Sequence, residues 1–182
     1  ELDSFVPDKL FDFHTHIWDE KDAADNQDFD TPLRMNNSFS DMHAWSREIF
    51  PGRKMGYVAL PTPLVAIDYV SHNNWVASEV QDMRSSGASD FLWAESGMLV
   101  HPDFSNAYLH QHIQDKQIKV LKPYRTFAEH PADARIKDFF PEQQMAAAND
   151  QGSAVVLHLS KRIGPADTEN ISDLQRYSKK YP

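Results

Sequence analysis

Residues Leu10–Trp18, with the sequence LFDFHTHIW, are predicted to form a short buried strand that carries two histidines. Residues two apart in a strand point to the same face of the sheet, so His14 and His16 should emerge side by side at the end of the strand. Two neutral imidazoles placed in this way suit a borderline divalent metal such as zinc. The alternative is a pair of unrelated histidines, one packed in the core and one at the surface.

Further apolar runs follow this stretch in alternation with helical patterns. Helices are predicted over 41–50 after an N-cap at Ser40, and over 66–85, 103–115, 133–149 with a break at Pro141, and 170–180. Strands are predicted over 54–60, 91–94 with 98–100, 118–124 and 154–160, and a long polar loop over 19–37. Several strands are apolar on both faces, which favours βα units around a parallel sheet. Residues 1–182 are expected to form one domain, with 38–50 as an inserted helix after the first strand.

The composition is that of a soluble globular protein with 41% hydrophobic and 25% charged residues. A net charge of −9 argues against nucleic acid as a partner, and no apolar run reaches membrane-spanning length. The absence of cysteine excludes disulfides, thiolate zinc sites and cysteine nucleophiles. A small-molecule substrate and a cytoplasmic location are expected, and homo-oligomerisation is left open.

A third histidine, His158, lies near the carboxyl end of the predicted strand 154–160. In a parallel barrel the carboxyl ends of all strands open onto one mouth, where active sites are built. His158 could therefore join His14 and His16 in a zinc site with an open position for water. A satisfied core histidine is the alternative. The histidines on predicted helices, His43, His72, His110 and His112, are interpreted as structural.

Two segments give the chain a family resemblance: FDFHTH at 11–16 and VVLH at 155–158, with βα units between them. Together they resemble the amidohydrolase superfamily, and most closely its "amidohydrolase 2" branch of metal-dependent hydrolases and decarboxylases. The resemblance implies a (β/α)8 TIM-barrel fold, a divalent metal ion such as Zn²⁺, His14 and His16 as ligands from the first strand, and His158 as a ligand or near-metal residue from the fifth.

About the first five βα units of such a barrel are expected in this sequence. The family has a further histidine on strand six and a catalytic aspartate at the end of strand eight, and no catalytic base is assigned in this chain. Five strands cannot close a barrel with the tilt and shear of eight. An open, curved parallel sheet is therefore expected, with the missing strands supplied by further chain or by a partner subunit.

Three charged residues near predicted strand ends are candidates for substrate binding. Lys122 and Arg125 follow the fourth strand, and Arg suits bidentate capture of a carboxylate. Glu95 is expected just past the third strand, where it could shuttle a proton or orient a ligand histidine. In binuclear members of the family a strand-four lysine is carboxylated and bridges two metals, whereas many single-metal members have a nearby lysine that is not a ligand, and Lys122 is expected to face the substrate. A surface role is the alternative for each of the three.

The sequence predicts a hydrolase that attacks an amide, lactone or ester of a small, acidic substrate. A non-oxidative decarboxylase or hydratase of the same superfamily is the first alternative. A phosphoesterase that also begins with H-x-H on a strand would be expected to carry further histidine and carboxylate motifs, and no convincing set is found. A catalytically incomplete fragment or interaction module is the third alternative.

Overall fold

A computed structural model describes residues 4–20, 22, 36–64, 67–161 and 163–181. The chain divides into two compact units, Glu1–Gly97 and Met98–Pro182. Most of the polar loop predicted over 19–37 lies outside the described residues.

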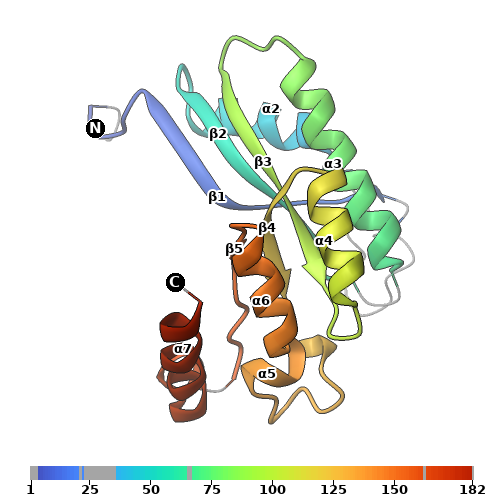
Figure 1. Ribbon diagram of the computed structural model, residues 1–182. Helices are drawn as coiled ribbons and strands as arrows, with labels where there is room; N and C mark the ends of the chain where they lie inside the picture. Colours follow the sequence, from blue (N-terminus) through green and yellow to red (C-terminus); the bar gives the residue numbers. More distant parts are fainter. Residues whose placement is uncertain (1–3, 21, 23–35, 65–66, 162, 182) are drawn as a thin grey trace. The chain divides into compact units, whose positions relative to one another are not determined.

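The first unit is a parallel sheet with two helices on one face (Figure 1). Its strands are β1 (Lys9–Ile17), β2 (Lys54–Pro61) and β3 (Phe91–Val100), the last of which continues into the second unit. β2 lies between β1 and β3 and pairs in parallel with both. Helices α2 (Phe39–Ile49) and α3 (Tyr69–Ser85) supply the βα connections.

The core of the first unit lies between the sheet and these helices. Phe39 of α2 and Val76 and Val80 of α3 pack against Ile17 of β1 and Tyr57 of β2, all of them at most 1% exposed. This sheet surface is called the helix face. α2 begins two residues earlier than its predicted N-cap at Ser40 implies, because Ser38 caps it and forms a reciprocal capping box with Asp41.

The second unit continues the alternation of strands and helices. β4 pairs in parallel with β5, which follows it after three helical segments. The elements are α4 (Asn106–Asp115), β4 (Ile118–Pro123), a 3₁₀ turn (Arg125–Phe127), α5 (Ile136–Phe139), α6 (Glu142–Asp150), β5 (Ala154–Val155), a second 3₁₀ turn (Gly164–Ala166) and α7 (Thr168–Lys180).

Two of the predicted strands are wrong in extent. β3 is continuous from Phe91 to Val100, so Gly97 does not interrupt it. The strand predicted over 154–160 is reduced to Ala154–Val155, with His158 joined to Tyr124 only by an isolated bridge. Its apolar run is half-exposed rather than buried on both sides, because β4 is the only described strand that pairs with it.

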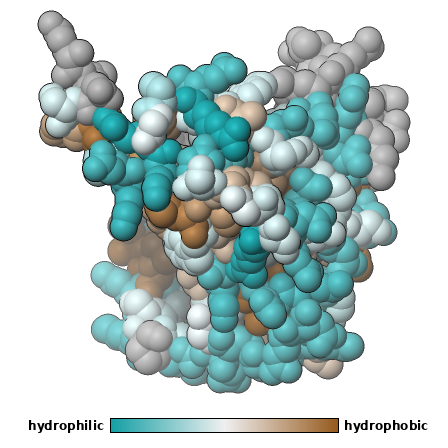
Figure 2. Space-filling view, turned by 90° about the horizontal axis from the view of Figure 1, so that it is seen from above, coloured by the Kyte–Doolittle hydropathy of each residue, from teal (hydrophilic) through white to brown (hydrophobic). Residues whose placement is uncertain are grey.

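Parallel strands joined by helices give an α/β fold of the (β/α)8 type, with five βα units in this chain, as predicted. No described helix has the length and apolar character needed to cross a membrane. Several large apolar side chains are solvent-exposed, among them Phe11, Phe13 and Trp93. Apolar patches among hydrophilic residues are visible on the surface in Figure 2.

Candidate metal-binding pair and its surroundings

A β-bulge in β1 determines where the two histidines point. Asp12 pairs with Tyr57 and Thr15 with Ala59, so β1 uses three residue steps where β2 uses two. Before the bulge, Leu10 packs toward the helix-face core. After it, Ile17 lies in that core. The alternation is therefore reversed at the bulge, and His14 and His16 project from the opposite face.

The imidazoles of His14 and His16 meet at their Nε2 atoms, which are 3.1 Å apart. Two nitrogens that each lie about 2.0–2.1 Å from a tetrahedral zinc ion are about 3.3 Å from one another. The pair therefore has the spacing that a shared metal ion requires, and the prediction that the two rings emerge together from β1 agrees with this geometry.

The ring of His16 is held by its other nitrogen. Nδ1 lies 3.0 Å from the carbonyl oxygen of Pro61 at the end of β2. Because that oxygen can only accept, Nδ1 carries the proton and Nε2 keeps its lone pair. The tautomer is thus the one that a metal ligand needs.

Three side chains form hydrogen bonds with the backbone around the pair. The Asp12 carboxylate accepts from the His14 N–H at 2.9 Å, across the bulge. Asn37 donates its side-chain amide to the His16 carbonyl at 2.8 Å, and the Thr62 hydroxyl donates to the Ile17 carbonyl at 3.3 Å. These bonds leave the end of β1 little freedom, which preorganises the two rings.

A larger ligand cluster is not present in the described part of the chain. No group of three or more histidine, cysteine, aspartate or glutamate side chains there could hold a metal ion. His14 and His16 belong to the first unit and His158 to the second. The three-histidine site stays a prediction.

The second unit gathers Lys122 and His158 around one phenol ring. The His158 and Tyr124 rings are 4.8 Å apart, and Lys122 Nζ lies 5.2 Å from the centroid of the Tyr124 ring. Lys122 is only 1% exposed, and burial lowers the pKa of its ammonium to about 8. With this pKa the lysine is still largely protonated at pH 7 and loses its proton in mildly alkaline solution.

Arg125 is engaged by its own loop. Its Nε donates to the Ser160 hydroxyl at 3.0 Å and its Nη2 to the Ser160 carbonyl at 3.2 Å. Nη1 donates to the carbonyls of Pro131 and Ala132. Four of the five guanidinium N–H groups are therefore occupied, so the fork is not presented to a substrate carboxylate in this conformation.

Glu95 lies in the middle of β3 and not beyond its end, because the strand continues through Gly97. Its carboxylate accepts from Arg84 at 2.9 Å and from the Trp93 indole at 3.0 Å. The contact with Arg84 ties β3 to α3, whereas Trp93 belongs to β3 itself. The predicted position at the carboxyl end of the third strand belongs to Val100 and His101 instead.

Sequence reasoning missed the residues that orient the pair. The Asp12 carboxylate two positions before His14 was a visible signal, since aspartate often accepts from a backbone N–H two residues on. The carbonyl of Pro61 could not have been found, because a backbone oxygen gives no sequence signal.

Comparison with known proteins supports the fold. No family model matches the sequence, and no curated protein matches it closely enough to show a relationship. The structure is similar to that of a probable 2-pyrone-4,6-dicarboxylic acid hydrolase from Acinetobacter baumannii, crystallised with citric acid. The TM-score is 0.61 at 10% identity, over 94% of this chain and 54% of that one. The chain thus spans about half the length of that structure.

A dihydroorotase from Campylobacter jejuni also matches, with a TM-score of 0.48, 12% identity and coverage of 94% of this chain and 45% of that one. Both enzymes are members of the amidohydrolase superfamily. The likeness to the Acinetobacter structure establishes the barrel-type fold only.

Proposed function

We propose that this chain provides the first part of the active site of a metal-dependent hydrolase of the amidohydrolase type, in which His14 and His16 hold a divalent metal ion, with Zn²⁺ the expected ion. The observation that carries the proposal is the 3.1 Å approach of the two Nε2 atoms, with His16 locked in the ligand tautomer by Pro61. Such an ion would polarise a carbonyl oxygen or lower the pKa of a water molecule.

The residues of the chain would act around that ion in separate ways. Asn37 and Asp12 hold the backbone of the histidine pair. His158 would supply a third ligand or a near-metal imidazole, and Lys122 would supply positive charge toward a small acidic substrate. That substrate class is supported by the structural neighbour, which is described as a hydrolase of a dicarboxylic acid and was crystallised with citric acid. The reaction would be hydrolysis of an amide, lactone or ester.

A decarboxylase or hydratase that uses the same ligands is the second candidate function. In that reaction the buried Lys122 would have the same role as in the hydrolase, as the cation for a substrate carboxylate. Product analysis separates the candidates, because a decarboxylase releases carbon dioxide while a hydrolase yields a new carboxylate without loss of carbon.

Metal titration tests the proposal directly. Isothermal titration of the metal-stripped chain with Co²⁺ or Zn²⁺ should show binding that His14→Ala or His16→Ala weakens by 100-fold or more, on the order of 3 kcal/mol. His110→Ala is the matched control, because His110 and His112 form the other H-x-H of the chain but lie on helix α4, where residues two apart do not share a face. Binding that survives loss of either strand histidine would overturn the proposal.

A further inference from the structure

His72 of α3 is connected to His16 through a single peptide group. The carbonyl of Pro61 accepts from His16 Nδ1 at 3.0 Å, and the N–H of Thr62 donates to His72 Nε2 at 3.1 Å. This carbonyl and this N–H belong to the same peptide unit, which ends β2. The two imidazoles are therefore bound to opposite ends of one amide.

The His72 side chain is fully buried and its surroundings allow one tautomer. It is 1% exposed as a residue and its ring stacks on Trp75 at 5.8 Å with an interplanar angle of 6°. Because Nε2 accepts from Thr62, Nδ1 carries the proton. Nδ1 has no hydrogen-bond partner among the described residues and lies 3.5 Å from the Asp22 carboxylate.

Burial keeps this histidine neutral. Desolvation, with a smaller contribution from the nearby His16, lowers the pKa of His72 to about 4, while Asp19 acts in the opposite direction. At neutral pH the neutral ring can therefore accept the hydrogen bond from the Thr62 N–H at Nε2, which a protonated ring could not do.

We propose that His72 is a positioning residue for the metal-binding pair, acting on His16 through the Pro61–Thr62 peptide. An amide whose N–H donates to a buried acceptor becomes a better acceptor at its oxygen, because hydrogen bonds in a chain polarise one another. The Pro61 carbonyl then binds the Nδ1–H of His16 more firmly, which fixes the ring and raises the basicity of Nε2 as a ligand. The effect on metal binding rests on the proposed function. The link from His72 through the Pro61–Thr62 peptide to His16, called the relay below, rests on geometry alone.

A measurement on the unmodified chain tests the relay first. In the ¹⁵N-labelled, metal-free protein, a scalar coupling across the hydrogen bond should connect the Thr62 amide nitrogen with His72 Nε2. Long-range ¹H–¹⁵N spectra should show His16 with its proton on Nδ1. Absence of the coupling would overturn the proposal without any variant.

Two substitutions then separate positioning from packing. His72→Phe keeps a ring against Trp75 and removes the acceptor, whereas His72→Gln can place an amide oxygen near the position of Nε2. With phenylalanine, His16 should become a mixture of tautomers and Co²⁺ binding should weaken by about 10-fold or more. With glutamine, both properties should return to within about 3-fold of the unmodified chain.

His43→Leu serves as the control, because His43 is another buried histidine of the first unit that contacts Tyr57 and Asp90 and not the Pro61–Thr62 peptide. It should leave the His16 tautomer unchanged. A wild-type tautomer in His72→Phe, or equal losses in the phenylalanine and glutamine variants, would overturn the role of the acceptor. If the tautomer shifts as expected but the unmodified chain binds no Co²⁺, the positioning stands and the metal-dependent function fails.

Discussion

The outermost strands of the two units, β1 and β5, differ in how many residues pair with the neighbouring strand. In the first unit β1 matches seven residues of β2 in register despite its bulge, whereas in the second β5 matches only two residues of β4. Each of these strands pairs with one described strand only. What differs is the support from elsewhere, because β1 packs Ile17 and Leu10 into the helix-face core while residues 154–160 are mostly half-exposed.

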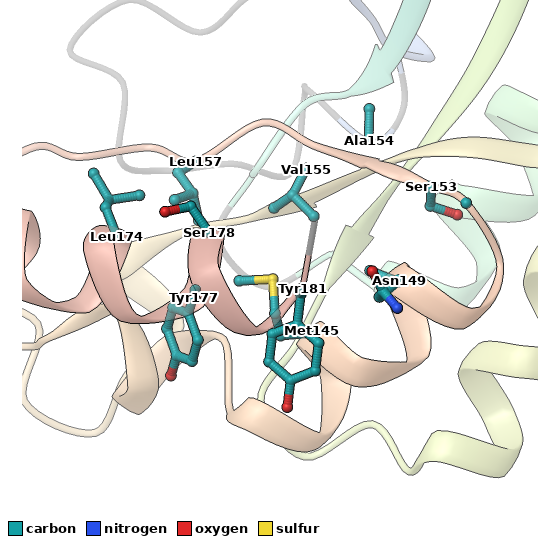
Figure 3. A pocket seen from close by; sticks show the side chains of 12 residues that line it. Met145, Asn149, Ser153, Ala154, Val155, Leu157, Leu174, Tyr177, Ser178 and Tyr181 are labelled. Carbon is teal, nitrogen blue, oxygen red and sulfur yellow. The ribbon is translucent and has the colours of Figure 1, made fainter.

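Both outer strands border an apolar groove. One of about 480 Å³ runs along β1 and α2 and is lined by residues such as Phe13, Trp45 and Ile49. The other, of about 500 Å³, lies between β5 and helices α6 and α7 and includes Leu157, Leu174 and Tyr177 (Figure 3). A strand that pairs with only one neighbour is therefore long where its own side chains pack into a core, and short where they do not.

Hydrogen exchange should show the largest difference between the units. Amides of residues 57–60, which lie in a strand paired on both sides, should exchange roughly 1,000-fold more slowly than amides of residues 154–158. Mass spectrometry or NMR of the metal-free chain would measure both. Equal exchange rates in the two segments would show that contacts other than its pairing with β4 stabilise β5.

Lys122→Met should remove a buried charge from β4 of the second unit. Burial lowers the pKa of Lys122 to about 8, so between about pH 8 and the ordinary value of 10.5 the unfolded chain binds more protons than the folded one. Stability therefore rises with pH across that window, and below it the full cost of the buried cation applies.

The methionine variant lacks this cost and should be more stable than the unmodified chain at pH 7, by about 1–3 kcal/mol. The difference should shrink as the pH approaches 10. Urea unfolding at several pH values measures this difference in unfolding free energy. The titration of the tyrosines drops out of the difference because both chains contain the same tyrosines. A difference that does not change with pH would contradict the assignment.

Gly56→Ala tests the packing on the exposed face of the first unit. A Cβ at Gly56 would lie 2.9 Å from Trp93 Cε3 and 3.1 Å from Phe11 Cδ2, where the two rings are 4.4 Å apart. The variant should lose about 1–2 kcal/mol of unfolding free energy. In a double-mutant cycle with Trp93→Ala, part of that cost should disappear. Purely additive effects would mean that the Trp93 ring is not the obstacle.

Arg125→Ala is expected to have the smallest effect, about 1 kcal/mol, because the loop carbonyls that it loses can turn to water. Any affinity of the chain for a tricarboxylate probe such as citrate should be the same in the variant, since the guanidinium binds Ser160, Pro131 and Ala132. Calorimetry with citrate and with a neutral analogue provides the check. Selective loss of citrate binding would restore Arg125 to the substrate-binding role predicted from sequence.

The fold could be predicted because apolar runs and caps record local structure. The boundaries of β2 and the end of α3 at Ser85 follow the pattern closely. The length of β5 could not be predicted, since it depends on what lies beside the strand and not on its own apolar residues. At the site, the H-x-H pattern indicated the convergence of His14 and His16. The engagement of Arg125 by a loop depends on contacts distant in sequence, and so does the link from His72 to His16.

The bulge divides β1 into two parts, and the alternation of side chains between the two faces of the sheet is reversed from one part to the other. Before the bulge an even-numbered residue, Leu10, faces the core, and after it an odd-numbered residue, Ile17, does so. Deleting one residue at 13 would restore a regular strand and turn either the histidines or the core residues to the wrong face. A single codon therefore decides whether this strand has a site at all, independently of whether the histidines themselves are retained.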